Sequence, residues 1–141
     1  MVSIAQSQSM LENRISDYFS HRDNIAAVYL FGSHAVGKER SGSDVDIAVL
    51  FQNRDPEPMI DSIDTYMVDL SRLLKKDIHP VVLNHAGEAL LAQVFKKGKC
   101  IVVNDQRKLS LFKVEAFAKI FDFKYYLTLM QNGLIKSVMQ G

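Results

Sequence analysis

The sequence has few cysteines, little net charge and no long apolar run, and each of these excludes a class of protein. Its 141 residues contain one cysteine, so no internal disulfide can form, which suits a reducing cytoplasm. The net charge is only +1, so there is no overall footprint for nucleic acid. No apolar run approaches the roughly 18 residues of a membrane span, and residues 1–10 lack the apolar core of a signal peptide. With no repeat or low-complexity linker, we expect one cytoplasmic domain without membrane or direct nucleic-acid contact.

Two apolar runs of strand length frame a pair of carboxylates. Residues 25–31 form the first run, and residues 44–51 form the second. Because side chains alternate along a strand, Asp44 and Asp46 share one face while Val45 and Ile47 point into the core. Two like charges on one face repel unless a cation lies between them. Magnesium uses one or two carboxylates and keeps positions for water and phosphate, so the pattern predicts an Mg²⁺ site.

A Gly-Ser turn follows the first run. Gly32 lets the backbone approach a phosphate closely, and the turn amides can donate to its oxygens together with the Ser33 hydroxyl. Alone, a Gly-Ser pair is a common turn, and an Asp-x-Asp is more often a solvated strand edge. Together, between two buried strands, they predict phosphoryl or nucleotidyl transfer, in which catalysis is mostly positioning and charge neutralisation.

A rival motif overlaps the same turn. Residues 32–38 have the glycine and lysine spacing of a phosphate-binding P-loop, but Glu39 stands where that loop has a Ser or Thr that ligates magnesium. A P-loop also opens a helix, whereas residues 40–43 favour turns and lead directly into a strand. The P-loop interpretation is therefore the weaker one.

The rest of the chain alternates between helical and extended patterns. Helices are expected over residues 9–21, 59–76 and 86–97, the last ending at Gly98, and strands over 77–83 and 100–103. This alternation indicates an α/β layer structure. Pro80 cannot donate a ladder hydrogen bond, so it places the third strand at an edge or a bulge. Cys100 begins an apolar run and is expected to be a buried structural thiol. The helix over 59–76 is expected to bury one stripe, made of Ile60, Ile63, Met67, Leu70 and Leu74.

The tail, residues 106–141, carries more apolar surface than one helix packed on one domain needs. A first helical stripe runs from Leu109 to Val138, and a second contains Leu111, Val114, Ala118, Phe121, Tyr125 and Leu129. Either a fold-back after Gly133 or a partner protein would cover the surplus face. Both alternatives stay open at this point.

The motif resembles that of a known family. Gly32 and Ser33, a ten-residue spacer, and Asp44 with Asp46 resemble the signature of the DNA polymerase beta-like nucleotidyltransferases, in their minimal nucleotidyltransferase branch. The resemblance implies an α/β (α+β) fold in which a small sheet is flanked by helices. It also implies a nucleotidyltransferase domain over residues 1–105, with a helical extension over 106–141 in the same compact unit.

Positions around the motif agree with the family unevenly. Three further residues match its fuller form: Gly37, Arg40 and Ser43. His34 and Val36 stand where many members have arginines, which leaves Lys38 and Arg40 as the nearby candidates for holding a triphosphate.

The resemblance also implies a further carboxylate on the third strand. Asp77 and His79 are two residues apart and hence share a face. A carboxylate suits magnesium better than an imidazole does, so Asp77 is the expected third metal ligand beside Asp44 and Asp46. If His79 takes that position instead, the metal rests on the two aspartates, with His79 available as a base.

The function that the resemblance implies is adenylyl transfer in a toxin–antitoxin pair. Asp44 and Asp46 would be catalytic, ATP the substrate and Mg²⁺ the cofactor, and AMP would pass to a hydroxyl, expected to be a tyrosine, of a HEPN-type ribonuclease toxin in a hetero-oligomeric complex. Two alternatives remain: a non-catalytic antitoxin that occludes its partner through the C-terminal helices, and an enzyme that modifies a small hydroxylated drug.

Overall fold

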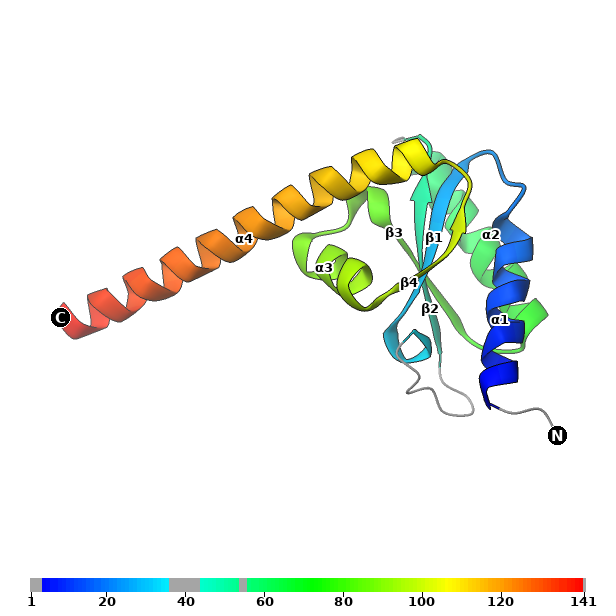
Figure 1. Ribbon diagram of the computed structural model, residues 1–141, viewed down its shortest axis with the longest axis horizontal. Coiled ribbons are helices and arrows are strands. Elements are labelled where there is room, and N and C mark those ends of the chain that lie inside the picture. Colours follow the sequence, from blue (N-terminus) through cyan, green and yellow to red (C-terminus); the bar gives the residue numbers. More distant parts are fainter. Residues whose placement is uncertain (1–3, 36–43, 54–55, 141) are drawn as a thin grey trace.

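A single four-stranded sheet organises the protein (Figure 1). The computed structural model describes residues 4–35, 44–53 and 56–140. The strands are β1 (Ile25–Phe31), β2 (Val45–Phe51), β3 (Ile78–Val82) and β4 (Lys99–Val103), and they lie in the order β3-β2-β1-β4. β1 runs antiparallel to both of its neighbours, while β2 and β3 are parallel. Pro80 lies in β3, an edge strand, as predicted from its missing donor.

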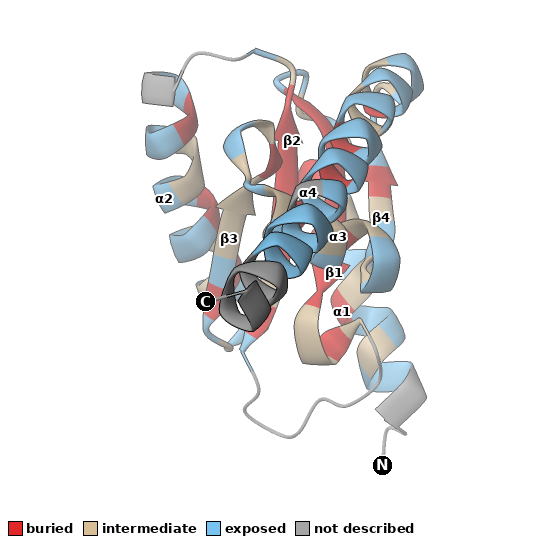
Figure 2. Cartoon of the chain, turned by 90° about the vertical axis from the view of Figure 1, so that its left-hand side faces the viewer, coloured by how far each residue is buried: buried red, intermediate tan, exposed pale blue. Residues whose placement is uncertain are grey.

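Helices cover both faces of this sheet. The helices are α1 (Ile4–Phe19), α2 (Pro56–Leu74), α3 (Glu88–Lys97) and α4 (Gln106–Gln140), with short 3-10 turns η1 (Gly32–His34) and η2 (Leu83–His85). α1 and α2 pack on one face, and α3 with the first part of α4 packs on the other. Because both faces are covered, β1 is buried along its whole length, which explains its uninterrupted apolar sequence (Figure 2). The expected α/β (α+β) class is confirmed.

α1 and α2 begin earlier than predicted, and α2 buries a partly different side from the one that its apolar pattern predicts. α2 begins at Pro56 rather than at residue 59, because proline is tolerated in the first turn of a helix. Its buried side includes Met59 and Tyr66, whereas Ile60 and Met67 are exposed, so the predicted stripe was wrong at those two positions. Apolar residues sit on both sides of the true stripe, and the pattern alone does not fix its phase. α1 begins at Ile4 rather than at residue 9, and its predicted stripe is buried: Leu11, Ile15 and Phe19.

Cys100 is exposed, so the expectation of a buried thiol was wrong. β4 is the second edge strand of the sheet, and its register against β1 is irregular next to the Tyr29–Cys100 pair. Gly98 ends α3 as predicted, and its N–H donates to the Val94 carbonyl at 2.8 Å. Its φ of −78° is ordinary, so the position requires glycine for space: an added Cβ would clash with that carbonyl oxygen.

α4 is one continuous helix, and the predicted alternative of a fold-back at Gly133 does not occur. Leu109, Ala116 and Ile120 are buried against the domain, after which the helix projects away from it (Figure 1). Nothing lies within 4 Å of a Cβ built at Gly133. Across the described ranges, no helix combines the length and apolar character that a bilayer crossing requires.

Asn84 fixes the end of β2 against the turn that follows β3. It accepts a hydrogen bond from the Phe51 N–H (2.8 Å) and donates one to the Phe51 carbonyl (2.9 Å). Asn84→Ala would leave both backbone groups of a buried residue without these bonds, at a cost of about 1–3 kcal/mol. Urea unfolding should show this loss for Asn84→Ala and none for the exposed control Asn53→Ala. Equal midpoints for the two variants would contradict this role.

Candidate active site

The Gly-Ser turn is pressed against the second aspartate. In the register of β1 and β2, Phe31 pairs with Asp46, and Gly32 then enters η1 with a φ of +73°. A Cβ at Gly32 would collide with the Asp46 carboxylate oxygen and lie 3.2 Å from its Cγ. Position 32 therefore needs glycine for its left-handed backbone and for its closeness to Asp46. The sequence predicted the glycine for phosphate approach only.

Asp44 lies just before β2 and Asp46 lies within it, on the same face, as predicted. Val45 and Ile47 are fully buried on the opposite face, whereas Asp44 is exposed and Asp46 is partly buried. Burial raises the pKa of the Asp46 carboxyl, and the charge of Asp44 raises it further, although His79 and His34 act in the opposite direction. Two clustered carboxylates of this kind favour a cation.

The neighbouring strand brings His79 to this pair. β3 is parallel to β2, and its register places His79 beside Asp46. The His79 Nε2 lies 3.1 Å from the Asp44 Oδ2, and both side chains are about half exposed. His79 is therefore the residue of β3 that the structure brings into contact with the pair.

Asp77 immediately precedes β3 and is not part of the contact between His79 and Asp44. Its side chain is exposed, and its carbonyl accepts a hydrogen bond from the Val45 N–H at 2.9 Å. Within the described part of the chain, no three His, Cys, Asp or Glu side chains gather into a metal-binding group. Asp77 as a third ligand stays a prediction. The two aspartates suffice for magnesium, because water and phosphate oxygens can complete its coordination.

Gln8 of α1, which the sequence analysis did not single out, binds the turn η1. Gln8 Nε2 donates to the His34 carbonyl at 2.9 Å, and Gln8 Oε1 lies 3.3 Å from His34 Nδ1. His34 is buried, so it supports the turn from within. No sequence signal marks Gln8, because it precedes the apolar stripe from which the helix was predicted. Lys38 and Arg40, the expected triphosphate ligands, lie outside the described residues.

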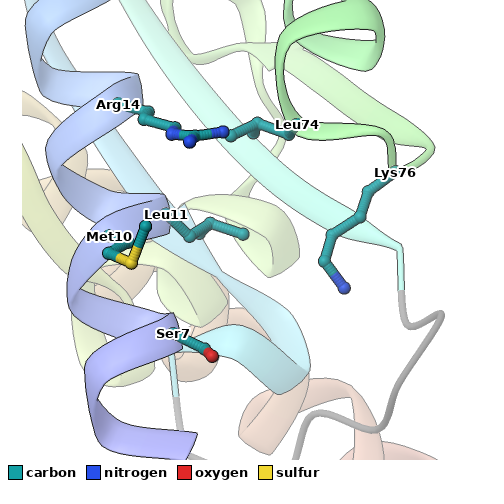
Figure 3. A pocket seen from close by; sticks show the side chains of 6 residues that line it. All are labelled: Ser7, Met10, Leu11, Arg14, Leu74 and Lys76. Atoms are coloured by element: carbon teal, nitrogen blue, oxygen red, sulfur yellow. The ribbon is translucent and has the colours of Figure 1, made fainter. Parts of the chain in front are cut away.

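A pocket lies between α1 and the end of α2, on the face of the sheet that these two helices cover (Figure 3). Its volume is about 250 Å³, and the lining combines an apolar floor with two basic groups: Ser7, Met10, Leu11, Arg14, Leu74 and Lys76. Arg14 reaches across it and donates to the Leu73 carbonyl at 3.4 Å. Asp44 and Asp46 do not line this pocket, so it is separate from the candidate active site.

Comparison with known proteins decides the family. Residues 13–107, from α1 to the start of α4, match the family model described as polymerase beta, nucleotidyltransferase. The chain belongs to the polymerase beta nucleotidyltransferase family. The predicted resemblance is thereby confirmed, and the P-loop interpretation is replaced, because the matched family model spans the whole turn.

Several relatives of this nucleotidyltransferase are similar over most of their length. The chain is 35% identical over 137 residues to the protein adenylyltransferase MntA of Shewanella oneidensis, covering 94% of this chain and 90% of the relative. A crystal structure of a toxin–antitoxin with AMP-PNP matches with a TM-score of 0.67 at 27% identity, covering 91% of this chain and 98% of the other. A tri-AMPylated Shewanella oneidensis HEPN toxin in complex with an MNT antitoxin matches with a TM-score of 0.64 at 26% identity, covering 94% and 98%.

Glycine substitutions test the turn. We expect Gly32→Ala to destabilise the nucleotidyltransferase by about 1–2 kcal/mol, because position 32 has a positive φ. The methyl group should also displace the Asp46 carboxylate, so nucleotide binding should weaken. Gly133→Ala, in an exposed helix, should instead stabilise by about 0.5–1 kcal/mol. Urea unfolding and calorimetric titration with Mg²⁺ and ATP would measure both effects, and unchanged values for Gly32→Ala would refute the account of the turn.

Neutralising Asp46 tests the electrostatics. Since its pKa is raised, the folded state binds the proton more tightly than the unfolded state does, and that stabilisation is lost as the pH rises through the raised value. The ionised carboxylate therefore costs stability at neutral pH. Without Mg²⁺, Asp46→Asn should melt at or above the wild-type temperature at pH 7, while the exposed control Asp64→Asn should not change it. A clear fall in the melting temperature of Asp46→Asn would mean that the protein itself compensates this charge.

Proposed function

We propose that this nucleotidyltransferase is an antitoxin that transfers AMP from ATP to a tyrosine hydroxyl of a HEPN ribonuclease toxin. The observation that carries the proposal is the carboxylate pair Asp44 and Asp46 at the start of β2, held against the Gly32 turn. Supporting it are the relative named protein adenylyltransferase MntA and the tri-AMPylated HEPN toxin bound to an MNT antitoxin. The cytoplasm is the compartment in which such a pair would act.

The reaction is a displacement at phosphorus. The hydroxyl oxygen of the acceptor forms a bond to the α-phosphorus of ATP, and the bond from that phosphorus to the oxygen bridging to the β-phosphate breaks. Pyrophosphate leaves, and the hydroxyl proton passes to solvent. Charge accumulates on the phosphate oxygens and the leaving group, so catalysis depends on positioning and neutralisation.

The residues of the site fit these needs. Asp44 and Asp46 would hold Mg²⁺, which when bound supplies positive charge to the triphosphate. The Gly32 turn amides and the partly exposed Ser33 hydroxyl would donate to phosphate oxygens. His79 keeps the Asp44 carboxylate oriented through its 3.1 Å contact.

A second candidate function is neutralisation by occlusion alone. The exposed apolar surface of α4 favours it, because a protein that covers its partner needs such a surface and no chemistry. The two functions differ in stoichiometry. An enzyme inactivates an excess of toxin, whereas an occluding protein acts one to one.

Intact-mass spectrometry of the toxin tests the proposal. After incubation of a tenfold excess of purified HEPN toxin with this protein, ATP and Mg²⁺, each transferred AMP should add about 329 Da, a value fixed by covalent chemistry. Asp44→Asn should add nothing while its fold and its binding to the toxin persist. Asp64→Asn on α2 is the matched control and should transfer normally.

An unmodified toxin that is protected equally by wild type and Asp44→Asn, and only at equal stoichiometry, would refute adenylyl transfer and favour occlusion.

A further inference from the structure

A series of polar contacts joins the edge strand β4 to the Gly-Ser turn by way of helix α1. Lys99, the first residue of β4, donates to both carboxylate oxygens of Glu12, at 2.9 and 3.0 Å. The Gln8 Nε2 lies 3.5 Å from the Glu12 Oε1 and donates to the His34 carbonyl at 2.9 Å. Gln8 and Glu12 are four residues apart on α1 and therefore share a face of that helix. We call Lys99, Glu12, Gln8 and His34 the polar chain.

The Glu12 carboxylate fixes the direction in which the Gln8 amide faces. An ionised carboxylate and a backbone carbonyl only accept hydrogen bonds, so the amide nitrogen of Gln8 faces both of them. The Gln8 Oε1 then faces the His34 Nδ1 at 3.3 Å, and this arrangement assigns the hydrogen to Nδ1. The reversed amide would set an oxygen against two acceptors. Gln8 therefore holds His34 by its backbone carbonyl and by its ring.

These two contacts fix the last residue of η1. His34 is only 4% exposed, so its ring is enclosed where Gln8 meets it. The peptide that follows His34 donates through the Ala35 N–H to the Gly32 carbonyl at 3.2 Å. The carbonyl of this peptide is thus bonded to Gln8 and its N–H to Gly32. The turn is held between α1 on one side and the Asp46 carboxylate, next to Gly32, on the other.

A turn of this size depends on such outside contacts. η1 has three residues, Gly32–His34, and neither end of it has a side-chain cap. Backbone amides bind a phosphate well only when they already point to it, because ordering them during binding costs conformational entropy. Side chains that fix the turn beforehand therefore raise the affinity for the ligand without touching it.

We propose that Gln8 positions the turn for the triphosphate of ATP, and that Glu12 and Lys99 act on the turn through Gln8. Gln8 is a positioning residue, because it acts through His34. The proposal rests on the proposed function and adds residues outside the motif that set the affinity for the nucleotide. It also assigns a role to a residue of β4, at the far edge of the sheet from β3.

Calorimetric titration with a non-hydrolysable ATP analogue and Mg²⁺ tests the role of Gln8. Gln8→Met keeps the length of the side chain but removes its donor and its acceptor, so the affinity should fall by about five- to tenfold. The KM for ATP should rise by a similar factor while kcat changes less, because the turn holds the triphosphate before and during the reaction. Asn13→Met, at an exposed position of the same helix, is the control and should bind like the wild type.

A double-mutant cycle tests whether Lys99 acts through Gln8. The Lys99 side chain is 57% exposed, and an exposed ion pair contributes little to stability, so Lys99→Met should melt near the wild-type temperature. Its affinity for the analogue should fall by about two- to threefold, because Glu12 loses the partner that holds it beside Gln8. In the Gln8→Met background the same change should have no further effect. Lys97→Met, an exposed lysine two residues earlier, is the control for charge.

The outcomes separate positioning from stability and from catalysis. If Gln8→Met lowers only the melting temperature and binds the analogue like the wild type, the polar chain serves stability alone and the proposal is overturned. An equal loss for Lys99→Met in both backgrounds would mean that its charge acts directly on the nucleotide, which overturns the path through Glu12.

Two further results bear on the parts separately. Should Gln8→Met not fold, Lys99→Met decides, and wild-type affinity in that variant would overturn the proposal. If the wild type binds the analogue and the variants lose affinity as expected, but the wild type adds no AMP to the toxin, positioning stands and the proposed transfer fails. A wild type that binds no nucleotide would refute both.

Discussion

Where β1 meets β2, the antiparallel register sets Phe31 opposite Asp46 and leaves the backbone of Gly32 against that carboxylate. Several features of the site depend on this contact. A side chain at position 32 would strain the left-handed backbone and push the Asp46 carboxylate aside, and the same contact keeps Asp46 partly buried. Burial and the neighbouring Asp44 raise the pKa of the Asp46 carboxyl, so a bound cation would offset an unfavourable charge there. The geometry of one strand pair thus sets the chemistry of the site.

Three parts of the fold differ in what they contribute: the helices that bury the core, the end of the sheet that carries the aspartates, and the projecting part of α4. α1 and α2 close one face of the sheet and supply most of a well-packed core. α3 and the first part of α4 close the other face, whose uncovered end presents the aspartates and His79. The remainder of α4 adds apolar and basic surface outside the core. In a protein that modifies another protein, such a surface can hold the acceptor while the sheet edge carries out the transfer, so binding energy remote from the reacting atoms contributes to the chemistry.

The parts that were predictable from sequence are those that local pattern determines. β1 and β2 were predicted almost to the residue because each is a nearly continuous apolar run, and the shared face of Asp44 and Asp46 follows from strand alternation alone. Long-range register is not local. Which of Asp77 and His79 lies beside the two aspartates depends on the register between β3 and β2, and the sequence of β3 does not determine that register. Cys100 was misplaced for a similar reason, since only the strand order shows that β4 is an edge. Whether the tail turns back after Gly133 is also open in the sequence, because both alternatives fit the same apolar pattern, and the structure continues the helix through that glycine.

The central proposal is that the carboxylate pair binds nucleotide through a shared cation. Titration of the wild-type protein with a non-hydrolysable ATP analogue, in the presence and in the absence of Mg²⁺, tests it directly by calorimetry. Without metal, the triphosphate meets two uncompensated carboxylates, so the account predicts measurable binding only when Mg²⁺ is present. Equal affinity with and without Mg²⁺ would contradict it.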